Sequence, residues 1–274
     1  MTRLISDQIR TIPEKLETYD EELKTKTGLK LGELAAQAAG IIAKQIEPQR
    51  VTVAVIPVTA GLGTIEGFSE AIRAIAIHLG FRAFITASTD VGGLAEAYES
   101  GADLAILADD YVYVAINLNT RRVAGNDEAT ALGYTMALAK MAGGLNGKEV
   151  LLIGAGPVGS KAAGALIETG AKLIVLDLDK QREAGLAEVI EKKYGRRVAF
   201  GLELEEALQR KPLIFDASTG EGFITASMIS ENTIVAAPGL PSGLTSEAQK
   251  KVAARLVHDP LQIGTAVMLF KALA

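Results

Sequence analysis

The chain of 274 residues contains no cysteine and only two histidines. The absence of cysteine excludes disulfide bonds, thiolate catalysis and cysteine-ligated zinc. The two histidines, His78 and His258, lie far apart in the sequence and do not form a histidine-rich metal motif. We therefore expect a protein without a bound metal ion.

The sequence also lacks a long hydrophobic run and an excess of basic residues. No apolar stretch reaches the roughly 18 residues that a membrane helix needs, and residues 1–12 include charged and polar side chains where a signal peptide would be apolar. The formal net charge is −5, with both signs mixed along the chain, which argues against nucleic-acid binding. We expect a cytoplasmic protein without membrane or nucleic-acid partners.

Hydrophobic residues make up 49% of the chain, which is long enough for two α/β lobes. Residues 2–47 place apolar side chains at helical spacing, and Gly28 interrupts the pattern. This region predicts two or three helices that cover one lobe or form the contact of a homodimer. The buried candidates in it are Leu16, Leu23, Leu31, Leu34 and Ile41.

A small parallel lobe is predicted after these helices. A buried strand begins at Val51, a glycine-rich turn follows at residues 59–67, and an amphipathic helix runs to about Leu79, with His78 packed or at the surface. Further elements are predicted as a strand at 82–86, a loop at 89–93, a short helix at 94–100, a strand at 104–107 and an edge hairpin at 112–118 and 120–124.

The glycine-rich turn is a candidate binding site because ligands of open α/β sheets bind at the carboxyl ends of strands. We expect Thr59, Gly61 and Gly63 to hold a substrate carboxylate or carbonyl group. Phosphate binding and a plain turn are the alternatives.

Two adjacent carboxylates, Asp109 and Asp110, follow the third strand of this lobe. Neighbouring side chains at a strand end point in different directions, so one can cap the turn while the other faces a ligand. A carboxylate in the cleft would hold a substrate ammonium group by a charge-assisted hydrogen bond. Asn117 and Asn126 flank the hairpin as candidate substrate contacts, and a helix is predicted from Asn126 to Met141.

The stretch 148–179 reads as a strand, a glycine turn, a helix and a second strand. This succession is typical of a dinucleotide-binding βαβ unit, in which the helix N-terminus faces the pyrophosphate. The second strand ends at Asp177, where a carboxylate would bind the adenosine ribose hydroxyls and repel a 2′-phosphate. We therefore expect NAD, although Arg182 leaves NADP as an alternative. The residues predicted to bind the cofactor in this unit are Gly154, Gly156, Pro157, Val158, Gly159 and Asp177.

The remainder of the chain completes the second lobe. Two loops that follow buried strands are predicted to border the cofactor, with Ser218 and Thr219 beside the adenosine half and Pro238 and Gly239 beside the nicotinamide. His258 is a candidate for substrate contact or for capping the final helix. The other predicted elements are helices at 180–194 and 202–209, strands at 197–200, 213–216, 234–236 and 255–257, and an apolar helix at 261–273 that crosses back to the first lobe.

The predicted fold class is α/β. N-terminal helices and a small parallel α/β lobe are followed by a Rossmann dinucleotide-binding lobe, and a C-terminal helix packs back. We expect domains at 1–144 and 145–274, joined by a hinge at the glycine-rich segment 143–147.

Six blocks between Ile56 and Leu269 resemble the pyrrolysine synthase family. The blocks are IPVTAGLGTIEGFSEAI, LADDYVYVAINL, VAGNDEATALGY, GAGPVG, APGLPSGLT and HDPLQIGTAVML. The resemblance implies an NAD-dependent enzyme that acts on the isopeptide of 3-methyl-D-ornithine with the side-chain amine of L-lysine. Hydride removal beside the terminal ornithine amine, attack by the α-amine and loss of ammonia would form a pyrroline ring.

The resemblance also suggests roles for individual residues. Asp110 matches the essential acid of the family, and Asn126 matches a substrate-contacting amide. The chain departs from the family pattern at Ala60, where that pattern has serine, so a hydroxyl contact is lost or passes to Thr59.

Two further classes of protein remain as alternatives. One is another two-lobed NAD(P)-dependent dehydrogenase, of the amino-acid or methylene-tetrahydrofolate type, although the turn at 59–67 lacks the lysine expected of a folate enzyme. The other is a non-catalytic dinucleotide sensor, although the N-terminal region lacks a basic DNA-binding stripe.

Overall fold

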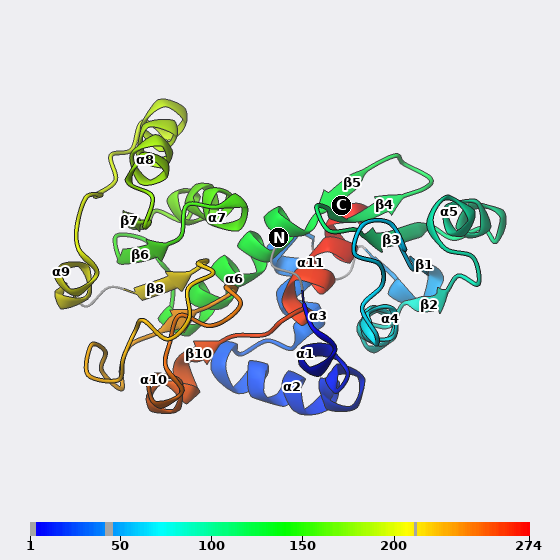
Figure 1. Ribbon diagram of the computed structural model, residues 1–274, viewed down its shortest axis with the longest axis horizontal. Coiled ribbons are helices and arrows are strands. Elements are labelled where there is room, and N and C mark those ends of the chain that lie inside the picture. The colour runs from blue at the N-terminus through cyan, green and yellow to red at the C-terminus, as the bar shows by residue number, and fades with distance from the viewer. Residues whose placement is uncertain (1–3, 42–45, 211–212) are drawn as a thin grey trace. The chain divides into compact units, whose positions relative to one another are not determined.

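A computed structural model describes residues 4–41, 46–210 and 213–274 (Figure 1). The chain forms two compact units, which we call the first lobe (Met1–Thr25, Leu29–Gly133 and Pro260–Ala274) and the second lobe (Lys26–Gly28 and Tyr134–Asp259). The division falls after Gly133, inside helix α6 (Asn126–Ala142), whereas the sequence suggested a boundary after residue 144. The final segment belongs to the first lobe.

Three helices occur among the described residues of the N-terminal region, in agreement with the sequence. They are α1 (Ser6–Ile9), α2 (Ile12–Thr27) and α3 (Leu31–Ala38). Gly28 adopts a positive φ of 78° just after α2, which explains the break in the helical pattern. All five apolar residues predicted for the core here are buried. Residues 1–3 and 42–45 of the predicted helical region lie outside the described residues.

A five-stranded sheet forms the centre of the first lobe, in the order β2-β1-β3-β4-β5. Its strands are β1 (Thr52–Ile56), β2 (Arg82–Ile85), β3 (Leu104–Ala108), β4 (Tyr113–Asn117) and β5 (Val123–Gly125), and a 3₁₀ turn at Pro48–Arg50 precedes them. The first three strands are parallel, whereas β4 is antiparallel to both β3 and β5. The hairpin predicted at the sheet edge is therefore present.

The two crossover helices of this sheet are α4 (Phe68–His78) and α5 (Asp90–Glu99). The chain moves from β1 to β2 in one direction and from β2 to β3 in the other, so right-handed crossovers place these helices on opposite faces. Ala54 and Ile56 belong to the apolar cluster that includes Ala97 of α5. Val53 and Val55 alternate with them and are buried on the other face.

Helix α5 begins at Asp90, whereas the sequence suggested a loop up to Gly93 and a helix from Leu94. The two glycines of this segment are part of the helix. A Cβ atom at Gly93 would lie 2.6 Å from Ile56 Cγ2 and 2.7 Å from the Ser88 carbonyl oxygen. Gly93 therefore permits a close approach of helix to strand, and its presence does not indicate a turn.

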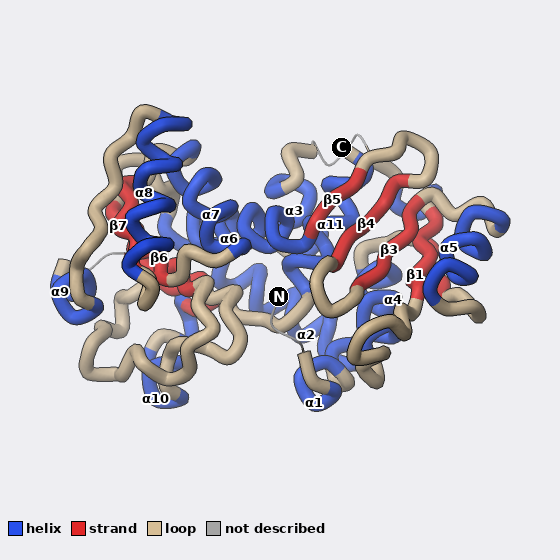
Figure 2. Tube along the Cα trace, turned by 45° about the horizontal axis from the view of Figure 1, so that its top comes forward, coloured by secondary structure: helices blue, strands red, loops and turns tan. Residues whose placement is uncertain are grey.

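The C-terminal helix α11 (Gln262–Leu273) completes the core of the first lobe. It contacts α3, α4, β4 and β5 (Figure 2). Its side chains are buried along almost its full length. A Cβ atom at Gly133 would lie 2.3 Å from Ile263 Cγ2, so this glycine brings α6 against α11. The Tyr113 hydroxyl group also lies 2.8 Å from Thr265 Oγ1. The prediction that the final helix crosses back to the first lobe is confirmed.

A second sheet of five parallel strands forms the centre of the second lobe, in the order β10-β9-β8-β6-β7. The strands are β6 (Glu149–Ile153), β7 (Lys172–Leu176), β8 (Leu213–Asp216), β9 (Val235–Ala236) and β10 (Leu256–Val257). The helices are α7 (Pro157–Glu168), α8 (Lys180–Tyr194), α9 (Leu204–Gln209) and α10 (Ser246–Lys251), with a 3₁₀ turn at Ala253–Arg255. This is the doubly wound arrangement of a Rossmann lobe, so the predicted fold class is confirmed.

The predicted strand at 197–200 is reduced to a single parallel bridge between Ala199 and Ile174. Gly201 follows with a positive φ of 76°, and its amide donates to the Glu183 carboxylate. The chain therefore leaves the edge of β7 after one residue pair, because a side chain of α8 takes the next backbone donor.

Candidate active site

The first lobe has a topological switch point between β1 and β3. The chain leaves β1 toward β2 and returns to β3 on the other side, and ligands of open α/β sheets bind at the carboxyl ends of the strands at such a point. The glycine-rich turn at 59–67 follows β1, and Asp109 and Asp110 follow β3. The fold thus brings the predicted turn and the predicted acids to one place.

Asp110 lies directly against the glycine-rich turn. Its Oδ2 accepts a hydrogen bond of 2.7 Å from the Leu62 amide. A Cβ atom at Gly61 would lie 2.1 Å from the same oxygen, and Gly61 adopts a φ of +70°. Any side chain at Gly61 would therefore displace the carboxylate, so this glycine is required by the position of Asp110.

Asp109 is exposed and bonds within its own turn. Its Oδ1 accepts hydrogen bonds of 2.7 Å from the amides of Tyr111 and Val112. The hydrogen bond from Tyr111, followed by that from Val112, lowers the pKa of Asp109 below its ordinary value. This geometry supports a turn-forming role for Asp109, while the assignment of Asp110 to the substrate stays a prediction.

Asp90 is a neighbour of the turn that sequence reasoning missed. It follows β2 and begins α5 with a φ of +53°, and its carboxylate receives two hydrogen bonds from Thr59. The Thr59 amide donates to Oδ1 at 2.8 Å, and Oγ1 of Thr59 lies 2.5 Å from Oδ2. These bonds, that from the hydroxyl group first, lower the pKa of Asp90. The sequence feature that could have identified Asp90 is its position as an acidic residue shortly after the carboxyl end of a strand.

The turn does not present the array of backbone amides that the sequence suggested for a substrate carboxylate. The Thr59 amide donates to Asp90, the Leu62 amide to Asp110, and the Gly63 amide to the Ala60 carbonyl at 3.3 Å. Carboxylates therefore line both sides of the turn. Such surroundings favour a cationic group over a phosphate or a carboxylate.

The two asparagines predicted to contact substrate are placed differently by the fold. Asn117 is buried at the end of β4 that pairs with Leu104. Leu104 is the first residue of β3, so Asn117 lies at the opposite end of the strands from Asp110, which follows the last residue of β3. Its side chain donates to the Ala272 carbonyl and accepts from two turn amides, so we remove it from the site.

Asn126 is half-buried at the start of α6, after β5. Its Oδ1 lies 3.2 Å from Thr130 Oγ1, and a Cβ atom at Gly264 would lie 2.7 Å from Oδ1. This oxygen thus serves the packing of α6 on α11, and a substrate contact by Asn126 stays a prediction.

The second lobe has its own switch point, between β6 and β8. Gly154 adopts a φ of +94°, and a Cβ atom there would lie 2.8 Å from the Ala217 carbonyl oxygen. A Cβ atom at Gly159 would lie 1.8 Å from the Gly154 carbonyl oxygen, whereas no atom lies within 4 Å of the Cβ position at Gly156. The first and third glycines are therefore required by packing, and the second leaves space for a ligand beside Pro157 and the start of α7.

Asp177 follows β7 and lies against the glycine turn. Its Oδ2 accepts a hydrogen bond of 2.6 Å from the Ala155 amide, and its Oδ1 accepts one of 2.8 Å from the Asp179 amide. A carboxylate oxygen has two lone pairs, so each can still accept a hydrogen bond from a ribose hydroxyl group. Arg182, the group that could favour NADP, forms an ion pair with Asp179 at 3.3 Å.

Glu183, on α8, holds the strand end that carries Asp177. Its side chain is 1% exposed, and its Oε2 accepts from the Asp177 amide at 3.0 Å and from Lys180 Nζ at 3.1 Å. Burial alone would raise the pKa of Glu183, but the hydrogen bonds from Asp177, Gly201 and Lys180 outweigh it and lower the pKa. Glu183 was not among the residues predicted from the sequence.

Asp216, at the end of β8, connects the two loops predicted to border the cofactor. It is fully buried, its Oδ1 accepts from the amide and hydroxyl groups of Ser218, and its Oδ2 accepts from the Gly243 amide. Burial raises the pKa of Asp216 above its ordinary value. Gly239 packs against these loops, since a Cβ atom there would lie 2.3 Å from the Ser218 carbonyl oxygen.

The remaining predicted cofactor residues lie on the same loops or on α7. Thr219 is exposed beside Ser218, and Pro238 is half-buried before Gly239. Val158 is half-buried in the first turn of α7. Their positions at the carboxyl ends of the strands match the prediction, and their contact with a cofactor stays a prediction.

The two histidines lie in different lobes. His258 follows β10, and its Nδ1 lies 2.7 Å from the Ala237 carbonyl oxygen, next to the predicted nicotinamide loop. His78 lies at the end of α4, with Nε2 2.8 Å from Asp20 Oδ2, and is therefore a packed histidine. No group of residues that could hold a metal ion occurs among the residues that the structure describes.

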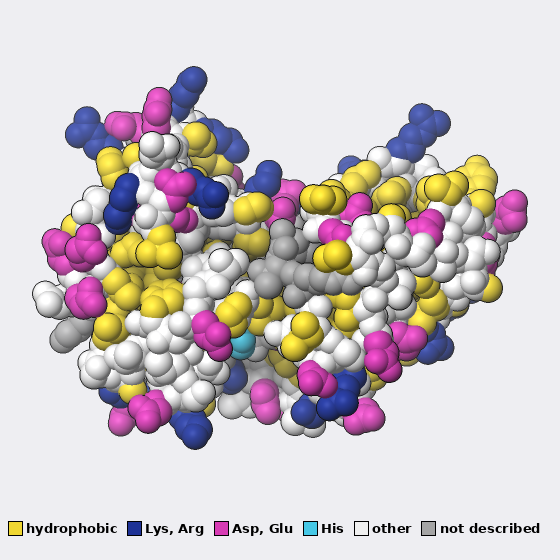
Figure 3. Space-filling view, in the orientation of Figure 1, with side chains coloured by type: hydrophobic (Ala, Val, Ile, Leu, Met, Phe, Trp, Pro, Cys, Tyr) yellow, Lys and Arg dark blue, Asp and Glu magenta, His cyan; other side chains and the backbone are white. Residues whose placement is uncertain are grey.

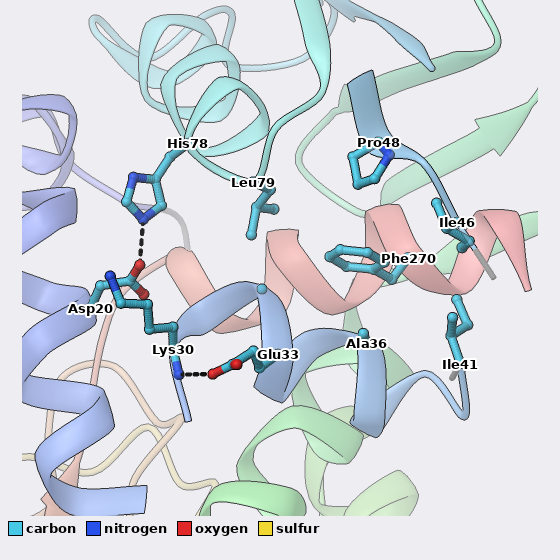
Figure 4. A pocket seen from close by; sticks show the side chains of 11 residues that line it. Asp20, Lys30, Glu33, Ala36, Ile41, Ile46, Pro48, His78, Leu79 and Phe270 are labelled. Carbon is cyan, nitrogen blue, oxygen red and sulfur yellow. Dashed lines mark hydrogen bonds and ion pairs between the residues drawn. The ribbon is translucent and has the colours of Figure 1, made fainter. Parts of the chain in front are cut away.

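A pocket of about 320 Å³ lies among α2, α3, α4 and α11 (Figure 4). Its polar end includes Asp20 and His78, which bond to each other, and Glu33, which accepts from the Lys30 amide. The Leu31 amide also donates to Asp20 at 2.7 Å. Because these polar groups are already paired within the lobe, we do not place the active site here.

Comparison with known proteins identifies the family. The chain is 32% identical to the pyrrolysine synthase of Methanosarcina acetivorans over 273 residues, which covers 100% of both chains. It is 29% identical to the pyrrolysine synthase of Methanosarcina barkeri, over 100% of this chain and 98% of that one. The chain belongs to the pyrrolysine synthase family.

Family models divide the chain in a way that agrees with its two lobes. A model of the N-terminal domain of the pyrrolysine biosynthesis protein PylD matches residues 8–124, and a model of shikimate/quinate 5-dehydrogenases matches residues 136–237. This chain is therefore an oxidoreductase with a Rossmann lobe, and the hypothesis of a non-catalytic sensor is wrong.

Solved structures share this fold at low sequence identity. Quinate dehydrogenase from Corynebacterium glutamicum in complex with NAD has a TM-score of 0.54 and 18% identity, over 82% of this chain and 93% of that one. A shikimate dehydrogenase in complex with NADP⁺ has a TM-score of 0.55 and 18% identity, over 83% and 91%. These likenesses concern the arrangement of the elements alone.

The surface and the helices add two further observations. Acidic and basic side chains are interspersed on the face shown in Figure 3. Within residues 4–41, 46–210 and 213–274, no helix has the length and apolar character needed to cross a membrane.

Proposed function

We propose that this enzyme oxidises the terminal amine of 3-methyl-D-ornithyl-N6-L-lysine with NAD and forms pyrrolysine by cyclisation. Family membership supports pyrrolysine formation. The observation that carries the assignment of the site is the contact of Asp110 with Gly61 and Leu62 at the switch point of the first lobe. A carboxylate held at this turn would be able to bind a substrate amine.

The charge of the turn supports an amine substrate. Asp90 and Asp110 lie on either side of residues 59–62, and each takes a backbone amide that could otherwise bind an anion. A charge-assisted hydrogen bond from an ammonium group to Asp110 would orient the carbon that loses hydride. Asp110 would then stabilise the developing iminium charge and accept a proton directly or through water.

The reaction balances with these groups. The terminal ammonium group first loses a proton, the carbon beside the resulting neutral amine then loses a hydride, and a protonated imine results. The deprotonated α-amine attacks this imine, the original terminal nitrogen leaves as ammonia, and the new C=N bond closes a five-membered ring. NAD, when bound, would supply the acceptor for the hydride.

Asp177 supports NAD rather than NADP as the cofactor. Both of its oxygens keep a lone pair for a ribose hydroxyl group, and a 2′-phosphate would meet this negative charge. Gly154, Gly156 and Gly159 would hold the pyrophosphate at the start of α7. We expect NAD to bind at least about tenfold more tightly than NADP, and Asp177→Ala to narrow this gap; equal affinities in the unmodified protein would count against this role.

The other assignments belong to the same proposal. His258 and Asn126 would contact the substrate, and Ser218, Thr219, Pro238 and Gly239 would border the cofactor. We also propose a homodimer in the cytoplasm. The alternative of an amino-acid or methylene-tetrahydrofolate dehydrogenase would require a different substrate at Asp110.

The proposed function has a direct test by mass spectrometry. The protein is incubated with the synthetic isopeptide and NAD, and the expected product is lighter than the isopeptide by one ammonia and two hydrogen atoms. Reduced cofactor should appear in equal amount. Turnover of an amino acid or of methylene-tetrahydrofolate, with no product from the isopeptide, would favour the alternative.

A further inference from the structure

Thr59 is held by Asp90 in a way that fixes the role of its hydroxyl group. Thr59 is exposed at the glycine-rich turn, and both its amide and its Oγ1 lie within hydrogen-bond distance of one carboxylate. An ionised carboxylate only accepts hydrogen bonds, so the hydroxyl proton of Thr59 must point to Asp90. The hydroxyl oxygen keeps its lone pairs and can act only as an acceptor toward a ligand.

The direction of this hydrogen bond determines which groups of a ligand the Thr59 hydroxyl group can bind. A hydroxyl group that is free to rotate can bind either a carbonyl oxygen or an N–H group. With its proton committed to Asp90, Thr59 can bind only a donor. Ala60 beside it has no polar side-chain atom, so the Thr59 oxygen is the hydroxyl contact that these two adjacent residues offer.

We infer that Asp90 is a specificity-determining positioning residue that sets Thr59 Oγ1 as an acceptor for an N–H group of the substrate. This inference rests on the proposed function and deepens it. Thr59 and Asp110 then bind separate N–H groups of the isopeptide, which carries several amine groups, at the same turn. On this inference, Thr59 binds a substrate N–H group in place of the carboxylate or carbonyl group that the sequence suggested.

Two substitutions at Asp90 separate this role from a structural one. In Asp90→Asn, the side-chain oxygen can still accept from the Thr59 amide, and the new NH₂ group donates to one lone pair of Thr59 Oγ1. The hydroxyl proton of Thr59 then points away from residue 90 and toward the ligand, where it opposes a substrate N–H group. In Asp90→Ala, the hydroxyl group is free to rotate and can still accept. Both variants lose the same charge, so their difference reports the direction of the hydrogen bond.

The variant with the lower Tm is therefore expected to be the one with the smaller rise in KM. Asparagine tolerates the positive φ at position 90 and alanine does not, so Asp90→Ala should have the lower Tm. Asp90→Asn should nevertheless show the larger rise in KM for the isopeptide, about tenfold or more, with KM for NAD unchanged. Thr59→Val should raise KM similarly, and adding Asp90→Asn to it should cause no further rise.

Glu96→Gln is the matched control. Glu96 lies on the same helix α5, and its carboxylate likewise accepts two backbone amides, from Ala87 and Ser88, at 2.9 and 2.8 Å. These bonds also lower its pKa. The substitution should lower Tm and leave KM for the isopeptide unchanged.

The experiment measures KM and kcat for pyrrolysine formation, KM for NAD, and Tm for all variants. A larger KM for Asp90→Ala than for Asp90→Asn, or equal effects of Asp90→Asn and Glu96→Gln, would overturn the inference. Failure of the proposed function is distinguishable, because the unmodified enzyme would then form no product from the isopeptide. In that case calorimetric binding of the isopeptide to the same variants gives the same comparison.

Discussion

Asp109 and Asp110 are adjacent in sequence, yet their carboxylates have different partners. Asp109 accepts from two amides of its own turn, whereas Asp110 reaches the turn after β1. The difference arises because successive side chains at a strand end point to opposite sides. The two acids can therefore be tested separately.

Asp110→Asn should keep the fold and the affinity for NAD, because the substitution is nearly isosteric and lies on the first lobe. Turnover should fall by about two to four orders of magnitude, as expected when a positioned electrostatic or acid-base group is lost. Asp109→Asn should keep most activity and lower Tm modestly. Steady-state kinetics and thermal unfolding check both. The reverse pattern would assign the substrate to Asp109.

At the scale of elements, the glycine turn between β6 and α7 combines packing with binding. Gly154 and Gly159 are packed so closely that a methyl group would contact backbone atoms, whereas the space at Gly156 is open. Helix α8 adds Glu183, which holds the end of β7. The turn and α8 therefore each contain a residue whose role can be tested, Gly156 and Glu183.

Gly156→Ala should fold with nearly unchanged Tm, because its φ of −73° suits alanine and no atom lies within 4 Å of the added carbon. The affinity for NAD should fall about tenfold or more, because the methyl group would stand where the pyrophosphate approaches. Calorimetric titration with NAD measures this. Gly185→Ala, on α8 and also open, is the control and should bind NAD normally. Equal affinities of both variants would move the pyrophosphate elsewhere.

Glu183→Gln should change how stability depends on pH. The pKa of Glu183 is lowered in the folded protein, so its charge stabilises the fold above the unfolded pKa, and this contribution is lost as the pH falls through the folded pKa. The variant should be less stable at neutral pH by about 1–3 kcal/mol and should lose less stability on acidification. Urea unfolding from pH 7 to pH 4 tests this. Parallel curves for both proteins would contradict the assignment.

For the whole molecule, the main feature is that the first lobe is built from both ends of the chain. Helix α11 contacts α3, α4, β4 and β5, while the second lobe lies between these segments in sequence. The core of the first lobe therefore closes only when the last residues of the chain are in place.

Removal of residues 260–274 should unfold the first lobe and leave the second lobe folded. The truncation exposes the apolar surfaces that α11 covers, including those around Ile263 and Val267. Hydrogen exchange should show lost protection in the strands β1 to β5 and retained protection in β6 to β8, with NAD still bound. Lys271→Ala, at a partly exposed position, should change neither lobe. Unfolding of both lobes together would contradict this independence.

The sequence by itself determined most of the elements, the order of the two lobes and the motifs. Apolar periodicity, glycine turns and strand-end acids are local features. The βαβ unit, the position of Asp177 at a strand end and the different orientations of the two acids after β3 could therefore be predicted. The helix start at Asp90 and the loss of the strand at 197–200 could not be predicted, because Gly93 packs on Ile56 and Glu183 takes the Gly201 amide. These contacts join residues that are distant in the chain.

Only the tertiary structure decided which polar groups meet at the glycine-rich turn. Sequence placed Thr59 and Gly61 in a turn that could hold an anion, but the fold brings Asp90 and Asp110 to the same amides. It also placed Asn117 beside the start of β3, at the opposite end of the strands from Asp110, because β4 runs antiparallel to β3. The order and direction of strands depend on the burial of complete sheet faces, and no local sequence pattern contains this information. The strand order in turn brings the two carboxylates to the turn and makes the candidate site acidic.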